Sequence, residues 1–305
     1  MAAAVAAAVP PPVVSDQKAP TLKVVTLNSL CNSLTHDNTG DGKQETKEQF
    51  DARMKDLVEF CTDSRADVVL LQEVEMSTVH AVQTATREFA FYWGPHKDDK
   101  NKPVSGGGAG ILIRKDAALF QGDGVSFDCD TLYYKAQRTP KDRRCAIVLR
   151  VWDAKTGMDY VFASVHLEGK RGDTGDALRI EQAAECAQLA RKKSSVKSTI
   201  VFGGDFEQPT ESIAGIDAVL AKNGLFRVVT DSKVCTCPRT GETLDFIYLS
   251  DPTLAKSVQP SIVPSHFASG VTVPKNLCPP YGFKAWGSDR CAVCITLAID
   301  KNSVS

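Results

Sequence analysis

The chain has 305 residues, with 36 basic and 37 acidic side chains and a formal net charge of −1. Hydrophobic residues make up 43% of it and charged residues 24%, as in ordinary globular proteins. This composition excludes a disordered chain, a collagen-like chain and a coiled coil. The balanced charge argues against a protein that holds nucleic acid by bulk positive charge, but it is compatible with a local basic cleft.

Ten cysteines are too few for a secreted scaffold held together by disulfides. Cys235, Cys237, Cys291 and Cys294 match a zinc spacing poorly, because an odd offset puts the last two on opposite faces of a strand. We therefore expect buried thiols rather than a zinc centre. Apolar runs fall short of the roughly 18 residues of a membrane span, and the N-terminus lacks the basic region of a signal peptide. The expected location is intracellular, in the cytoplasm or the nucleus.

Residues 1–20 predict a flexible tail rich in Ala and Pro, and residues 21–305 predict a single domain, because no composition shift divides them. Apolar runs predict strands over 21–28, 67–74, 143–152, 158–167, 198–205, 243–250 and 291–299. Helical spacing predicts helices over 45–63, 77–89, 174–192 and 211–223. The glycines at 106–108 predict a flexible loop that leads into another strand. Buried strands alternating with helices indicate an α/β fold with packed sheets and helices outside.

Polar side chains that can bind metal or transfer protons stand at or near the ends of successive predicted strands. They are Asn28, Glu73, His166, Asp205, Asp245 and Asp289. One such residue is ordinary, but so many at the ends of buried strands are not, because burial of unpaired polar groups is costly. Converging carboxylates and an amide oxygen suit a hard divalent cation such as Mg²⁺, which keeps waters that a phosphate can replace. The pattern therefore predicts a metal site built from strand ends.

These residues stand in motifs that resemble the endonuclease/exonuclease/phosphatase superfamily, in the order of that family, over residues 21–300. The motifs are LNSL at Asn28, DVVLLQEVE at Glu73, SVHLEG at His166, GGDFEQP at Asp205, TLDFIYLS at Asp245 and GSDR at Asp289. The resemblance implies a four-layer α/β sandwich of the deoxyribonuclease I type, with two packed mixed β-sheets flanked by helices. The motifs LQEVE and DFIYLS are most similar to those of the nocturnin and deadenylase branch.

The resemblance also implies a role for each residue. Asn28, Glu73 and Asp289 would hold Mg²⁺, with Mn²⁺ as an alternative. His166 would contact the scissile phosphate, Asp205 would orient the attacking water, and Asp245 and Asp289 would support the site. The implied reaction is hydrolysis of a phosphodiester by positioning and electrostatics. The implied substrate is nucleic acid, with RNA favoured over DNA, or a nucleotide; the sequence names no protein partner.

Two residues of the expected catalytic set depart from the family's motifs. Glu207 stands where the family has the asparagine of GDFN, and Arg290 stands where it has the histidine of SDH. Glutamate brings negative charge and no hydrogen-bond donor, and the loss of such a donor costs about 10²–10³ in rate. Arginine stays protonated and cannot act as a general base, whose loss costs about 10²–10⁴. We expect Arg290 to pair with Asp245 or Glu207, or to bind a phosphate.

Three functions stay open from the sequence. The first is a Mg²⁺-dependent phosphodiesterase. The second is a catalytically degenerate member that binds nucleic acid or a phosphate ligand. The third is a lipid or inositol phosphate phosphatase, which needs a basic pocket and a membrane-facing loop. His266 is a candidate substitute base, and the basic run 135–144 is a candidate contact to a phosphate backbone.

Overall fold

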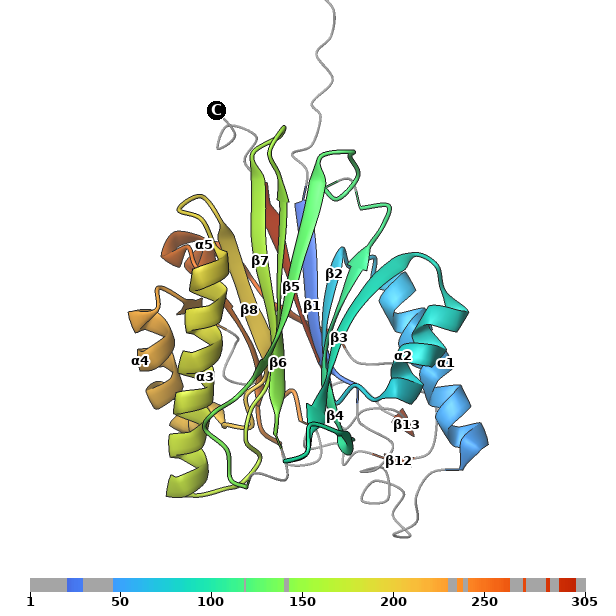
Figure 1. Cartoon of the computed structure of the whole chain (residues 1–305), viewed down its shortest axis with the longest axis vertical. Helices are drawn as coiled ribbons and strands as arrows, with labels where there is room; N and C mark the ends of the chain where they lie inside the picture. The colour runs from blue at the N-terminus through green and yellow to red at the C-terminus, as the bar shows by residue number, and fades with distance from the viewer. Residues whose placement is uncertain are drawn as a thin grey trace, which may run out of the picture.

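Two six-stranded β-sheets pack face to face, and helices cover the outer face of each sheet (Figure 1). This architecture confirms the predicted four-layer α/β sandwich. The expected tail at 1–20 lies outside the described residues. The structure, a computed structural model, describes residues 21–29, 46–117, 119–139, 143–229, 235–237, 241–263, 271–272, 284–285 and 291–299.

The first sheet has the strand order β11–β14–β1–β2–β4–β3, in which β1 and β2 are parallel and the other neighbours are antiparallel. Its strands are β1 (Thr21–Asn28), β2 (Val68–Gln72), β3 (Phe89–Lys97), β4 (Pro103–Arg114), β11 (Ser261–Val263) and β14 (Ala292–Ala298). Helices α1 (Lys47–Asp63) and α2 (Met76–Ala85) cover its outer face. The last strand, β14, pairs with the first, so that Thr21 lies opposite Ala298.

The second sheet has the strand order β5–β6–β7–β8–β10–β9, in which β7 and β8 are parallel. Its strands are β5 (Val125–Tyr133), β6 (Cys145–Asp153), β7 (Met158–His166), β8 (Thr199–Asp205), β9 (Phe226–Arg227) and β10 (Asp245–Leu249). Helices α3 (Asp173–Lys193) and α4 (Ala214–Lys222) cover its outer face. The shorter elements are a 3₁₀ turn (Thr210–Ser212), α5 (Pro252–Ser257), and the pair β12 (Val271–Thr272) and β13 (Lys284–Ala285).

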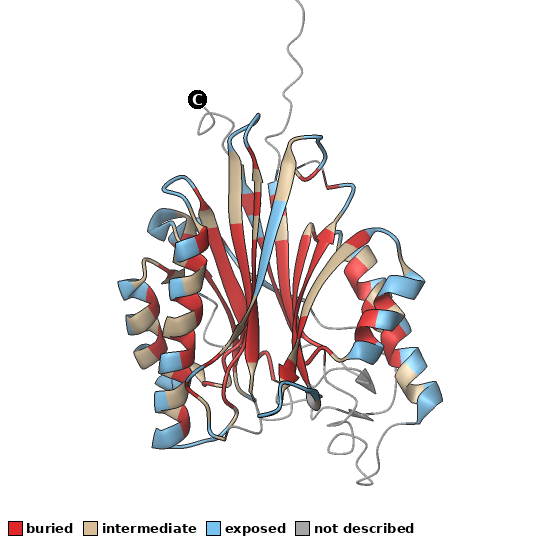
Figure 2. Cartoon of the chain, in the orientation of Figure 1, coloured by how far each residue is buried: buried red, intermediate tan, exposed pale blue. Residues whose placement is uncertain are grey.

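Buried residues lie along the central strands and on the helix faces turned toward the sheets (Figure 2). Their apolar side chains form three layers, one between the sheets and one beneath the helices on each side. Leu70, Ile147 and Phe162 belong to the layer between the sheets. Central strands are buried on both faces, which is why they read as continuous apolar runs in the sequence. Each such side chain contributes about 1.5–3 kcal/mol to stability. Among the described helices, none combines the length and apolar character of a membrane-spanning helix.

A buried polar network joins the two sheets near the carboxyl ends of β2 and β7. Gln72 Nε2 of the first sheet donates to Ser164 Oγ of the second, at 3.1 Å, and to Thr26 Oγ1 at 3.2 Å. Ser164 Oγ in turn donates to the carbonyl oxygen of Leu71 at 2.8 Å. Because hydrogen bonds are directional, this network fixes how the sheets slide relative to each other, which apolar packing alone leaves less defined.

The structure differs from the sequence predictions at several elements of the first sheet and at one edge of the second. The helix predicted over 77–89 is α2, which ends at Ala85, and Phe89 already begins β3. The glycines at 106–108 form part of β4 and are no flexible loop. Strands β3 and β5 were not predicted, because both lie at sheet edges and have few fully buried side chains. The four cysteines considered for zinc are all buried.

Replacement of Ser164 by alanine tests the network between the sheets. A buried polar group left without a partner costs about 1–3 kcal/mol, so we expect Ser164→Ala to lower the free energy of unfolding by about 2 kcal/mol. Urea unfolding measures this loss. The exposed Ser77→Ala is the control, with an expected change below about 0.5 kcal/mol. Equal changes in the two variants would contradict a stabilising role for the network.

Candidate functional site

The inner face of each central strand becomes polar toward its carboxyl end. In β1, Val24 is followed on the same face by Thr26 and Asn28, and β2 passes likewise from Leu70 to Gln72. In the second sheet, β7 runs from Phe162 through Ser164 to His166, and β8 runs from Val201 to Asp205. The register pairs His166 with Asp205, and Asp205 with Asp245. Ligand sites of α/β sheets form outside such carboxyl ends.

Asn28 connects a carboxylate of each half of the sandwich. Its Nδ2 donates to Glu73 Oε1 at 2.7 Å and to Asp205 Oδ2 at 3.0 Å, and all three side chains are buried. The amide thus positions two carboxylates that come from different sheets. Metal binding by Asn28 itself stays a prediction, because these contacts use its nitrogen and not its oxygen.

Glu73 reaches the site because the chain leaves the strand conformation after Gln72. Strict alternation would turn Glu73 away from the inner face, but its φ of 57° breaks the alternation. Such left-handed backbone costs about 1–2 kcal/mol for a residue other than glycine. Gly107 of β4 packs directly on it, since a Cβ at Gly107 would lie 2.7 Å from Glu73 Cα. Gly107 therefore serves close approach to Glu73.

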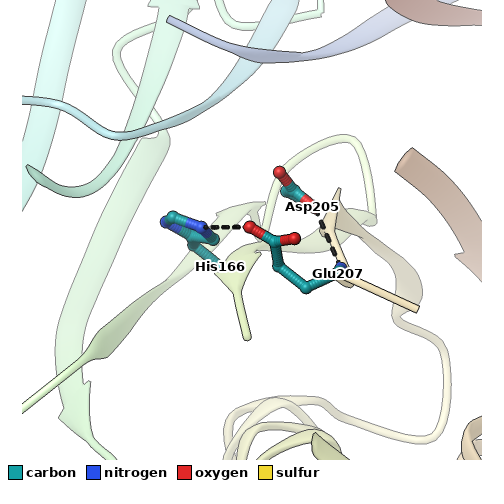
Figure 3. Close-up of side chains that lie close together, drawn as sticks. All are labelled: His166, Asp205 and Glu207. Atoms are coloured by element: carbon teal, nitrogen blue, oxygen red, sulfur yellow. Dashed lines mark hydrogen bonds and ion pairs between the residues drawn. The ribbon is translucent and has the colours of Figure 1, made fainter. Parts of the chain in front are cut away.

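His166 and Glu207 face each other beside Asp205 (Figure 3). His166 Nε2 lies 3.4 Å from Glu207 Oε1 and 4.0 Å from Glu73 Oε1. The backbone N–H of Glu207 donates to Asp205 Oδ1 at 2.9 Å. Ligand atoms of His166, Asp205 and Glu207 all lie within 4.8 Å of one another. One imidazole and several carboxylates gathered at one place are donors that suit a divalent metal ion.

Glu207 also has left-handed backbone, with a φ of 52°. Asparagine adopts this conformation more readily than glutamate does. The asparagine of the family's motif therefore suits the backbone at this position as well as supplying an amide. Sequence reasoning identified the change of chemistry at Glu207 but not the backbone strain.

Arg179 of α3 connects the loop that follows His166 with the loop that carries Glu207. Its Nη1 donates to the carbonyl oxygens of Glu168 and Lys170, at 2.6 and 2.8 Å, and its Nε donates to Gln208 Oε1. The side chain is fully buried, and burial lowers the pKa of Arg179. This role could not be predicted from the sequence, because Arg179 occupies an ordinary polar position in a helix.

Two further basic residues lie near His166. His96 of β3 is buried with its ring centroid 6.1 Å from that of His166. Burial, with Arg144 and His166 nearby, holds the pKa of His96 well below its usual range, so His96 is neutral at physiological pH. Arg144 Nη1 donates to the carbonyl oxygen of Leu167, directly after His166. Arg144 belongs to the basic run 135–144, which the sequence analysis singled out. His96 was not identified from the sequence, because its strand was not predicted.

Asp289, Arg290 and His266 lie outside the described residues, so their predicted roles stay predictions. Asp245 is fully buried at the start of β10, and its backbone N–H donates to Thr236 Oγ1 at 3.1 Å. The structure therefore brings together Asn28, Glu73, His166, Asp205 and Glu207, with Asp245 paired to Asp205 in the sheet.

Residues 25–289 match the Endonuclease/Exonuclease/phosphatase family. The chain belongs to this family. A search of curated protein sequences finds no match. The family has a hydrolase fold, it includes nucleases and other phosphodiesterases, and its members generally use divalent metals.

Solved structures share the fold of this family member at low sequence identity. Humanized D. rerio TDP2, with 14 mutations, is 16% identical, with a TM-score of 0.60 over 92% of this chain and 99% of that chain. A family protein from Bacteroides vulgatus is 16% identical, with a TM-score of 0.63 over 92% and 99%. The human nocturnin catalytic domain with bound sulfate is 16% identical, with a TM-score of 0.61 over 91% and 94%.

Replacement of Glu207 by asparagine tests the backbone strain. We expect Glu207→Asn to raise the free energy of unfolding by about 1 kcal/mol, because asparagine tolerates left-handed backbone. Chemical denaturation of the metal-free protein measures the change. Glu211→Asn is the control, since Glu211 lies outside left-handed backbone, and a change below about 0.5 kcal/mol is expected. A lower free energy of unfolding in Glu207→Asn, with Glu211→Asn unchanged, would contradict backbone strain at Glu207.

Replacement of Arg179 by methionine tests the connection between the loops. Several carbonyl acceptors lose a buried donor, so we expect a loss of stability on the order of 3 kcal/mol. Hydrogen exchange should speed up in both loops, 168–170 and 206–208, whereas the exposed Arg87→Met should leave both unchanged. Faster exchange in one loop only would show that Arg179 does not couple them.

Proposed function

We propose that the protein is a Mg²⁺-dependent phosphodiesterase that hydrolyses nucleic acid or a related nucleotide. The observation that carries the proposal is the meeting of Asn28, Glu73, His166 and Asp205, from both sheets, at one end of the sandwich. Oxygen donors dominate this cluster, and Mg²⁺ prefers oxygen. Family membership supports the reaction class.

Glu73 is the described residue best placed to hold the ion, because Asn28 fixes one of its carboxylate oxygens. Asp289 is a further ligand on sequence grounds. Bound Mg²⁺ polarises a phosphate oxygen and neutralises developing negative charge. The chain itself supplies the geometry that brings water and phosphate to the metal.

Asp205 is suited to orient the attacking water. Its two oxygens accept from Asn28 Nδ2 and from the N–H of Glu207, so the carboxylate is held in one orientation. Hydrogen bonds to a carboxylate favour its charged form, which can accept a proton from water. Asp245, opposite Asp205 in the sheet, adds a second buried carboxyl group behind it.

His166 is suited to bind the phosphate. Its Nε2 faces Glu207 Oε1 at 3.4 Å. His96 beside it is neutral, so Arg144 supplies the positive charge on this side of the site. Arg144 lies close by, bonded to the loop directly after His166. A fixed cation near a phosphate stabilises charge that develops in the transition state.

Nucleic acid is the substrate class that we propose, with RNA as the first candidate. The preference for RNA rests on the similarity of the motifs LQEVE and DFIYLS to the nocturnin and deadenylase branch of the family. A solved structure of D. rerio TDP2, 16% identical, contains a single-strand DNA product, which favours nucleic acid more broadly. Single-stranded RNA and DNA both belong in the substrate panel for this reason.

One observation favours a rival function, a degenerate member that binds a phosphate ligand or nucleic acid without turnover. Glu207 Oε1 faces His166 Nε2 at 3.4 Å, where a phosphate oxygen would have to lie. A carboxylate there repels phosphate unless a cation lies between them. The described residues add no support for the lipid or inositol phosphate alternative.

Cleavage assays separate these functions. We expect Mg²⁺-dependent cleavage of labelled poly(A), mixed single-stranded RNA, single-stranded DNA or abasic duplex DNA, abolished by chelator. Glu73→Gln should lower the rate by about 10²-fold or more, because a neutral amide binds Mg²⁺ poorly. The exposed Glu59→Gln is the control and should retain the rate.

Cleavage by the wild-type protein distinguishes an enzyme from a degenerate member that only binds its ligand. No cleavage by folded wild-type protein, with activity gained in Arg290→His, would establish a scaffold kept for binding. Cleavage that survives Glu73→Gln would contradict the placement of the metal at Glu73.

A further inference from the structure

The site contains a second histidine, His96, which stands in none of the motifs that this chain shares with its family. His96 belongs to β3 in the first sheet, and His166 ends β7 in the second. Their ring centroids are 6.1 Å apart, so the two imidazoles lie next to each other across the boundary between the sheets. Both side chains are buried, with 2% and 3% of their surface exposed. A phosphate that contacts His166 is therefore also close to His96.

The two rings and the neighbouring Arg144 have buried nitrogen atoms that pair with nothing in the protein. Among the described residues, His96 Nε2 has no hydrogen-bond partner, and the same holds for His166 Nδ1 and Arg144 Nε. The charge of Arg144 acts on His96, so the three side chains form one cluster. Burial of a polar atom without a partner is destabilising, and such atoms are rare in folded proteins. Three of them in one place indicate groups that are kept for a ligand.

The neutral state of His96 decides which ligand atoms suit it. Its pKa lies well below the usual range, because burial and the nearby Arg144 and His166 oppose a positive charge on the ring. A neutral imidazole carries one N–H, which can stand on either ring nitrogen. With that proton on Nε2, His96 is an uncharged donor inside the site, and an oxygen of a phosphate group is the matching acceptor.

An uncharged donor is the kind of group that the loop of Glu207 has lost. The family's GDFN motif has an amide there, whereas the carboxylate of Glu207 cannot donate when ionised. An amide N–H and the N–H of a neutral imidazole are alike in charge and in the acceptors that they bind. His96 thus offers, from β3 of the other sheet, a donor that replaces the missing amide.

We propose that His96 is a catalytic residue of this chain, whose Nε2–H donates to an oxygen of the scissile phosphate beside His166. An N–H···O bond is about 2.9 Å long, so two rings 6.1 Å apart can both bond to one phosphate group. The donor stabilises the negative charge that develops on the phosphate oxygens while water attacks, and it transfers no proton. The role in the reaction rests on the proposed function, whereas the contact itself needs only a bound phosphate.

Removal of the donor tests the role of His96 in the reaction. On the nucleic acid that wild type cleaves with Mg²⁺, we expect His96→Phe to lower kcat by about 10²-fold or more. His96→Gln keeps an uncharged N–H donor and should retain at least about a tenth of the wild-type kcat. His80→Phe, at an exposed position of α2, is the matched control and should leave kcat unchanged. An unchanged kcat in His96→Phe, or equal losses in His96→Phe and His96→Gln, would overturn the assignment.

The variant Glu207→Asn tests whether His96 replaces the family's amide. With the amide restored, loss of the imidazole should matter less, because groups that share one task are not additive. We expect His96→Phe to cost about 10-fold or less in the Glu207→Asn background. The same loss in both backgrounds would show that His96 does not stand in for the amide.

Binding of inorganic phosphate, with Mg²⁺ present, measures the contact without turnover. Nuclear magnetic resonance of ¹⁵N-labelled histidine should show a shift of the His96 Nε2 signal as phosphate is added. A hydrogen bond to a charged group is worth about 10-fold or more in affinity, so His96→Phe should bind phosphate at least about 10-fold more weakly than His80→Phe does. Equal affinity in the two variants would contradict the contact.

The two proposals fail in different ways. Phosphate binding that depends on His96, in a wild-type protein that cleaves no nucleic acid, would support the contact and overturn the proposed function. Mg²⁺-dependent cleavage that is equally fast in His96→Phe would support the proposed function and overturn the role of His96.

Discussion

The two hydrogen bonds from Asn28, to Glu73 and Asp205, are the constraint on which the site depends. The acceptors come from different sheets, so the site exists only while the sheets keep their relative position. The network of Gln72 and Ser164 holds that position one layer deeper in the sandwich. Polar groups are costly to bury unless paired, and here Asn28–Asp205 and Gln72–Ser164 are pairs that span the boundary between the sheets. Stability of the sandwich and geometry of the site therefore have a common physical origin.

The two halves of the molecule bring polar side chains to the site by the same arrangement of strands and helix. β1–α1–β2 and β7–α3–β8 are each a pair of parallel strands joined by a helix, and each brings two polar side chains to its carboxyl end. The sequence shows no repeat of residue identity. What the halves share is a pattern, apolar residues on the inner face followed by polar ones toward the carboxyl end. Such a pattern follows from burial and strand period, and it needs no identical residues.

The sequence predicted the fold class and the residues at strand ends because strong apolar runs ended in polar groups. Asn28, His166 and Asp205 could be found in this way. His96 could not, since an edge strand with partly exposed faces gives a weak pattern. Arg179 could not, since only the packing of α3 against the loops shows why a buried arginine is tolerated. The left-handed backbone of Glu73 and Glu207 could not be predicted either, because glutamate does not favour this conformation and the surrounding structure imposes it.

The pairing of β1 with β14 has a consequence for folding during synthesis. β1 gains β2 as a neighbour early, but its other edge stays without β14 until residues 292–298 have been made. At roughly 5–20 residues per second, that interval lasts on the order of 10 s or more. An apolar strand with an open edge is a template for pairing with other chains. During this interval β1 can pair with the wrong strand, whereas in the folded protein β14 covers its edge from Thr21 to Thr26.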